Sequence, residues 1–120
     1  MPAAARQAAV EDGLAAYARG DFFLAHELLE PPWMGAHDLA ERELLQGIIK
    51  LAAAFVHGAR SNPAGVEKNL RGARERIANG LAAGPVLGID AAALLEAIDE
   101  WLREPVEDGP AIPIRRARRS

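Results

Sequence analysis

The sequence predicts an all-α fold, a compact single-domain bundle of about five helices joined by short loops. Three observations support this prediction. Apolar residues recur at helical spacing in five segments, residues typical of helix ends separate those segments, and no segment shows the strict alternation of a half-buried strand. The chain has 120 residues, which is long enough for one hydrophobic core.

The first two helices are predicted from their ends. The first runs from about residue 3 to residue 19, and Gly20 follows as its terminator. Asp21 can cap the second helix, which carries the stretch FFLAHELLEPPW. Because a proline lacks the amide hydrogen of the helical ladder and clashes with the preceding turn, this helix is expected to break at Pro31 and Pro32.

The third and fourth helices have clear start signals. Asp38 can cap a third helix over about residues 39–59. Asn62 and Pro63 predict the start of the fourth, because a capping side chain is followed by a residue with no amide hydrogen to satisfy. This helix is expected to end at Gly80.

The fifth helix follows a predicted loop, LAAGPVLG. Asp90 caps it and Pro105 stops it. One face of this helix is apolar over its whole length, and it consists of Leu94, Leu95, Ile98, Trp101 and Leu102.

Two regions are expected, a helical bundle domain over residues 1–103 and a loosely ordered tail over residues 104–120. The tail has three prolines and no helical period, and chain ends of this kind are commonly frayed. Its last six residues include four arginines, whereas the formal net charge of the whole chain is -3. An acidic body argues against nucleic-acid binding, apart from contacts made by the basic end, Arg115 to Arg119.

Composition also indicates the setting of the protein. The chain has no cysteine, which excludes disulfides and thiolate ligands and fits a reducing cytoplasm. The N-terminal residues lack the apolar core of a signal peptide. The longest apolar run is far shorter than the roughly 20 residues of a membrane-spanning helix. We therefore expect a cytoplasmic protein with no membrane segment.

The second helix carries the candidate site residues. At about 100° per residue, His26 falls on the same face as Phe22 and Trp33, and Glu30 falls at the edge of that face one turn later. We therefore predict a buried His26–Glu30 pair that Trp33 covers. Because a buried polar group needs a partner, Gln46 and Tyr17 could join this cluster through hydrogen bonds.

His57 decides whether the cluster has a third member. It shares one side of the third helix with Gln46 and Lys50, a pattern more typical of a solvent-facing histidine. If the second helix packs over the small residues beside this strip, His57 would join His26 and Glu30. Two histidines and a carboxylate could bind zinc, iron or manganese, so a divalent metal is possible, although no cofactor is predicted outright.

Two familiar metal motifs are incomplete in this sequence. The stretch HELLE resembles the zinc-protease motif, but Glu30 stands where that motif has its second histidine, and Glu27 points away from the face of His26. A di-iron bundle requires two Glu-x-x-His pairs, and the sequence has none. Neither chemistry is therefore favoured.

Several stretches together resemble a known family. Its hallmark is a histidine, three residues, a glutamate, two residues and a tryptophan, which matches His26, Glu30 and Trp33 in AHELLEPPW. The stretches LLQGIIKLAAAFVH, SNPAG and the GID before the last helix resemble its other blocks. The chain is therefore similar to the domain-of-unknown-function family 309 of bacteria and archaea over roughly residues 13–102. The resemblance implies a compact all-helical fold and no particular function.

Four functions fit these residues. A structural role is favoured, in which the His26–Glu30 pair fixes how the second helix docks. The same residues could instead form a small-molecule site in which His26 acts as general base on an attacking water. The third possibility is the metal site of His26, Glu30 and His57. The fourth is an interaction module, in which an exposed Phe23 and Leu24 bind a partner helix or a second copy in a homo-oligomer.

Overall fold

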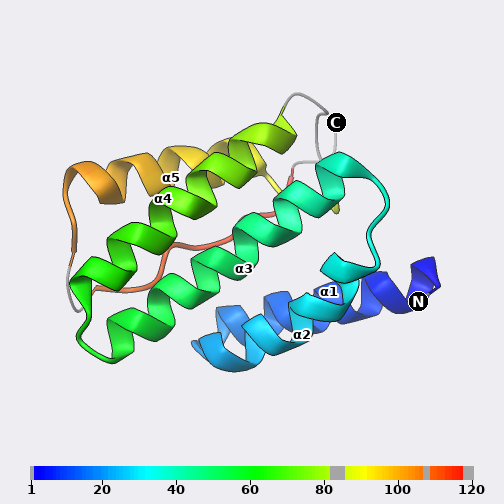
Figure 1. Cartoon of the computed structure of the whole chain (residues 1–120), viewed down its shortest axis with the longest axis horizontal. Helices are drawn as coiled ribbons and strands as arrows, with labels where there is room; N and C mark the ends of the chain where they lie inside the picture. Colours follow the sequence, from blue (N-terminus) through cyan, green and yellow to red (C-terminus); the bar gives the residue numbers. More distant parts are fainter. Residues whose placement is uncertain (1, 82–85, 107–108, 118–120) are drawn as a thin grey trace.

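Five helices make up the regular structure of the residues that the computed structural model describes, which are 2–81, 86–106 and 109–117 (Figure 1). They are α1 (Ala3–Ala18), α2 (Phe22–Met34), α3 (Leu39–Ala59), α4 (Pro63–Gly80) and α5 (Ala91–Arg103). The predicted all-α, single-domain bundle is thereby confirmed. Part of the predicted loop LAAGPVLG lies outside the described residues. No described helix is both long enough and apolar enough to cross a membrane.

Helix α3 is the central element of the bundle. It packs against α2 and α4, while α1 covers α2 and α5 covers α4 (Figure 1). Short connections cause consecutive helices to fold back beside one another, as in other helical bundles. The core lies along both sides of α3, and its largest fully buried members there are Leu44, Leu45, Ile48 and Leu51.

Local side-chain chemistry sets the helix starts. Asp21 accepts a hydrogen bond from the Leu24 amide, and Asp38 accepts one from the Glu41 amide at 2.9 Å. The side chains of Asn62 and Asp90 cap α4 and α5 in the same way. All four predicted caps are confirmed, because a cap depends only on residues within one turn of each other.

The predicted break of α2 at Pro31 and Pro32 is wrong, since the helix continues to Met34. Proline has a helical φ and can therefore follow the helical path, although its missing amide hydrogen and its clash with the carbonyl four residues earlier cost stability. The ladder resumes at once, with the Gly35 amide donating to the Pro31 carbonyl at 3.0 Å. Pro32 is also fully buried, and its apolar contacts offset part of the loss.

The segment after α5 contacts the helical bundle. The sequence indicated a loosely ordered tail from residue 104, whereas residues 109–117 run back along the bundle (Figure 1). Ile112 is buried in the core, and its carbonyl accepts a 2.6 Å hydrogen bond from the Tyr17 hydroxyl. The Arg115 carbonyl accepts a further bond from the Asp90 amide at 2.9 Å. Residues 109–117 lie on the bundle because Ile112 adds an apolar side chain to the core. Its carbonyl also accepts the hydrogen bond that the buried Tyr17 hydroxyl needs.

Candidate functional site

The buried face of α2 is rotated away from the face that we predicted. Its buried residues are Ala25, Leu29 and Pro32. On a helical wheel the centre of this set lies about 90° from His26 and about 130° from Glu30. His26 is accordingly half-buried at the edge of the interface, and Glu30 is exposed.

The predicted buried His26–Glu30 pair is therefore not found. Apart from Tyr17 with its hydroxyl, no polar or charged residue in the described part of the chain is buried, and no described hydrogen bond joins His26 to Glu30. Tyr17 does not join them, because its hydroxyl donates to Ile112 instead. Gln46 is half-buried on α3. An exposed carboxylate keeps its hydration without a partner, so nothing requires this pair to form.

His57 lies against the start of α4. Its Nδ1 is 3.2 Å from the side-chain nitrogen Nδ2 of Asn62, and a Cβ placed on Gly65 would lie only 2.7 Å from its ring. The ring is therefore packed on the first turn of α4 and takes part in the turn between α3 and α4. Across the residues that the structure describes, no three His, Asp or Glu side chains lie close enough together to hold a metal.

Trp33 has a different neighbour from the one predicted. The guanidinium of Arg42 lies over its ring, 5.2 Å from the centroid. Its indole nitrogen is buried without a hydrogen-bond partner in the described structure. This cation–π contact joins the end of α2 to the first turn of α3, so the geometry gives Trp33 a role in packing of those helices.

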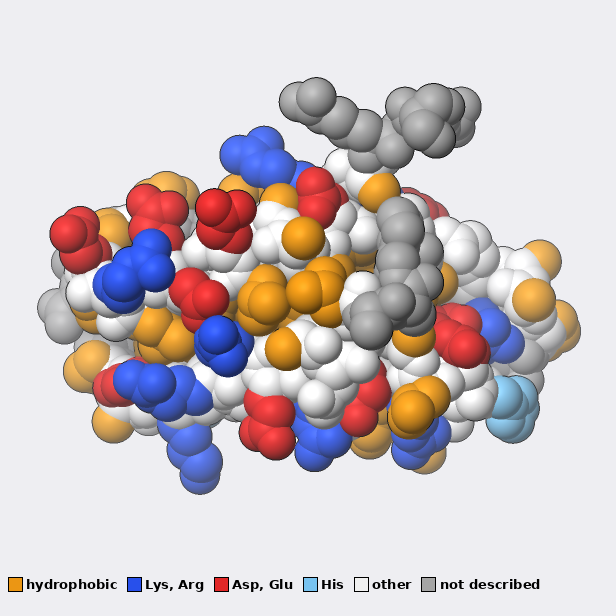
Figure 2. Space-filling model, turned by 90° about the horizontal axis from the view of Figure 1, so that it is seen from above, with side chains coloured by type: hydrophobic (Ala, Val, Ile, Leu, Met, Phe, Trp, Pro, Cys, Tyr) orange, Lys and Arg blue, Asp and Glu red, His pale blue; other side chains and the backbone are white. Residues whose placement is uncertain are grey.

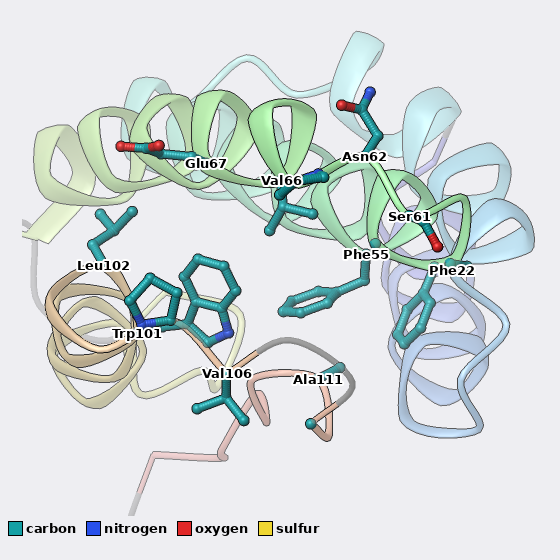
Figure 3. A pocket seen from close by; sticks show the side chains of 15 residues that line it. Phe22, Phe55, Ser61, Asn62, Val66, Glu67, Trp101, Leu102, Val106 and Ala111 are labelled. Carbon is teal, nitrogen blue, oxygen red and sulfur yellow. The ribbon is translucent and has the colours of Figure 1, made fainter.

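A cleft of about 740 Å³ lies elsewhere, between the α3–α4 turn, the start of α2, the end of α5 and the segment that follows it. Its apolar lining includes Phe22, Phe55, Val66, Trp101, Val106 and Ala111. Figure 3 shows Phe55 and Trp101 projecting toward the same space, with Val66 above them. Phe22 and Phe55 lie with their ring centroids 5.6 Å apart and form one aromatic wall. Ser61 and Asn62 add polar groups to the lining.

Sequence reasoning did not find this cleft. The sequence predicts Trp101 only as part of the apolar face of the fifth helix, and Ala111 falls in the predicted tail. The sequence carries only a weak signal for the cleft. Six aromatic residues occur in the chain, and three of them, Phe22, Phe55 and Trp101, line the cleft. No sequence pattern shows that residues this far apart meet.

Comparison with known families agrees with the resemblance seen in the sequence. A family model described as Domain of unknown function (DUF309) matches residues 10–73, more than half of the chain. The chain belongs to this family. The DUF309 match contains all of α2 and α3, whereas α5 and the C-terminal segment lie outside it. The cleft therefore joins two parts, with Phe22 and Phe55 inside the match and Trp101 outside it. No curated protein matches this DUF309 chain.

Replacing His26 and replacing Tyr17 should affect the free energy of unfolding differently. Replacing His26 with alanine is expected to change the free energy of unfolding by less than about 1 kcal/mol, because the ring is half-buried and holds no described hydrogen bond. Tyr17→Phe should cost about 1–3 kcal/mol, since it leaves the buried Ile112 carbonyl without its donor. Urea unfolding followed by circular dichroism measures both. A larger loss for His26→Ala than for Tyr17→Phe would contradict this assignment.

Proposed function

We propose that this DUF309 protein binds a small, largely apolar molecule in the cleft between the α3–α4 turn and α5. The observation that carries the proposal is the size and lining of that cleft. Its volume of about 740 Å³ falls within the range of roughly 300–1,000 Å³ that is typical of small-molecule sites. A site of this kind combines an apolar wall with a few polar groups that orient the ligand.

The aromatic side chains suit a flat apolar ligand. Phe22 and Phe55, whose ring planes are tilted by 41°, line one side, and Trp101 faces the same space from α5 (Figure 3). Aromatic side chains bury a large area for few rotatable bonds, and a planar ligand can stack on them at little entropic cost. Ser61, whose hydroxyl lies in the polar part of the lining, would contact the polar end of such a ligand.

This function differs from the one favoured by the sequence. The structural role and the hydrolytic alternative both required a buried His26–Glu30 pair, and Glu30 is exposed. The ligand site proposed here uses neither residue. The proposal keeps the small-molecule class of function that the sequence left open, but its binding site lies in another part of the bundle.

The test uses N-phenyl-1-naphthylamine, a neutral apolar fluorophore, as the probe. The chain has two tryptophans, so Trp33→Phe leaves Trp101 as the sole tryptophan reporter in the cleft. Titration should quench Trp101 emission through one saturable site per chain. Phe55→Ala should weaken binding at least about tenfold, which corresponds to about 1.4 kcal/mol, because it removes the centre of the aromatic wall.

The matched control is Phe23→Ala, the same chemical change at an exposed phenylalanine of α2 that does not line the cleft. It should leave the affinity unchanged. Circular dichroism checks that each variant is folded, and Phe55→Leu replaces Phe55→Ala if that variant unfolds. Equal weakening by the Phe55 and Phe23 variants, or no saturable quenching, would refute the site.

A further inference from the structure

Exposed apolar side chains are concentrated on α2 and at the start of α3. The described structure has six large apolar side chains that are exposed, and four of them lie between residues 23 and 39. Phe23 is 61% exposed, Met34 is 65% exposed and Leu39 is 72% exposed. Single exposed apolar residues are ordinary, but a group of them on one surface is typical of an interaction site.

These side chains share one face of α2 with two carboxylates. We call this surface the outer α2 face and define it by Phe23, Leu24, Glu27, Glu30 and Met34. All five residues are exposed, and on a helical wheel their centre lies about 180° from the buried set of Ala25, Leu29 and Pro32. Phe23 and Met34 are separated by only about 20° around the helix and by about 16 Å along it. The face is therefore a continuous stripe about three turns long.

The charged residues of the outer α2 face, Glu27 and Glu30, are both acidic. Helix α2 contains no lysine or arginine, and residues 19–38 include four carboxylates and one arginine, Arg19, while Arg42 of α3 lies over the ring of Trp33 near the end of α2. Neither Glu27 nor Glu30 forms an ion pair with any other described residue. The opposite side of the molecule is different, since basic and acidic side chains alternate over α4 and α5 (Figure 2) and pairs such as Arg74 with Asp99 neutralise each other.

From this arrangement we infer that the outer α2 face is a docking site for a cationic amphipathic helix of a partner protein. Charge complementarity identifies the partner: its apolar side chains would cover Phe23, Leu24 and Met34, and its lysines or arginines would pair with Glu27 and Glu30. An acidic partner would be repelled, and a purely apolar one would leave both carboxylates without compensation. The inference is independent of the cleft, because none of these residues lines it.

The probes are two synthetic peptides of about 14 residues, long enough to span the stripe as a helix. One combines leucine and lysine in an amphipathic pattern, and the other has glutamate in place of every lysine. Fluorescence anisotropy of the labelled peptides with the full chain gives the affinities. The lysine peptide should bind at least about tenfold more tightly, and its affinity should fall as salt is raised because exposed charge pairs are screened.

Two double variants test whether binding depends on the outer α2 face or only on the overall negative charge of the protein. Glu27→Gln with Glu30→Gln should weaken the lysine peptide at least about tenfold. The control, Glu75→Gln with Glu96→Gln, removes the same charge from exposed positions of α4 and α5 and should change the affinity less than about twofold. Phe23→Ser should also weaken binding, and because Phe23 is exposed this change should leave the fold intact.

Three outcomes would overturn the inference. Equal binding of the two peptides would show that charge complementarity does not select the partner. Equal weakening by both double variants would show only general attraction to an acidic protein. A dimer in light scattering that Phe23→Ser dissociates would assign the outer α2 face to a second copy of the chain.

Discussion

Replacing Leu29 with alanine is expected to lower the free energy of unfolding by about 2–5 kcal/mol. Leu29 is fully buried between α1 and α2, and it lies directly on the bare backbone of Gly13. A Cβ on Gly13 would be only 2.6 Å from the Leu29 side chain, so Leu29 occupies the space that a larger residue at position 13 would fill. Truncation leaves a cavity that this backbone cannot fill. Urea unfolding followed by circular dichroism measures the loss.

The matched control is Leu24→Ala, the same change on the exposed side of the same helix, which should cost less than about 1 kcal/mol. A second comparison tests the contact itself. Gly13→Ala should destabilise the wild type more than it destabilises the Leu29→Ala variant, because the new methyl group can occupy the cavity. Additive effects of the two substitutions would show that Leu29 and Gly13 are not coupled.

Gly47→Leu should be at least as damaging, with an expected loss of about 3 kcal/mol or more. Gly47 lies at a close contact of α3 with α4: a Cβ there would be 2.6 Å from the Ile77 side chain and 3.2 Å from the Ala73 carbonyl oxygen. A backbone oxygen moves only if the whole helix moves, and a leucine would therefore force α4 away from α3. Thermal unfolding followed by circular dichroism gives the change.

Gly72→Leu is the control for this substitution, because it also adds a leucine at a glycine of the α3–α4 pair. A Cβ on Gly72 would meet the flexible end of Lys50, at 3.1 Å, which can move aside. The expected loss is less than about 1 kcal/mol. If the two glycine variants unfold at similar temperatures, close approach at Gly47 is not what holds α3 and α4 together.

The candidate site illustrates where reasoning from sequence failed. The helical period placed His26 and Glu30 correctly relative to each other and to Phe22. The predicted buried face was centred near Phe22 and Trp33, whereas the buried residues of α2 are Ala25, Leu29 and Pro32. Small residues decide how a helix is rotated when a partner comes close, and the contact of Leu29 with Gly13 is such an approach. Glu30 therefore turned out to be exposed.

The C-terminal segment makes a contact that the sequence did not indicate. Three prolines and a basic end are typical of a frayed tail, yet Ile112 is buried and receives the Tyr17 hydrogen bond across 95 positions of sequence. Burial raises the pKa of Tyr17 far above its ordinary range, so its hydroxyl stays protonated and remains a donor. Nothing near Ile112 in the sequence indicates this partner.

Short-range sequence features were sufficient to predict where the helices form. The four caps, the five helical segments and the all-α class follow from residues within a few positions of one another, because a helix satisfies its hydrogen bonds within a single turn. Three features depended on how the helices assemble: the rotation of α2, the course of residues 109–117, and the cleft between Phe55 and Trp101. Each arises from contacts between side chains far apart in the chain, and the energy of such contacts depends on shape and distance that no short pattern of residues encodes.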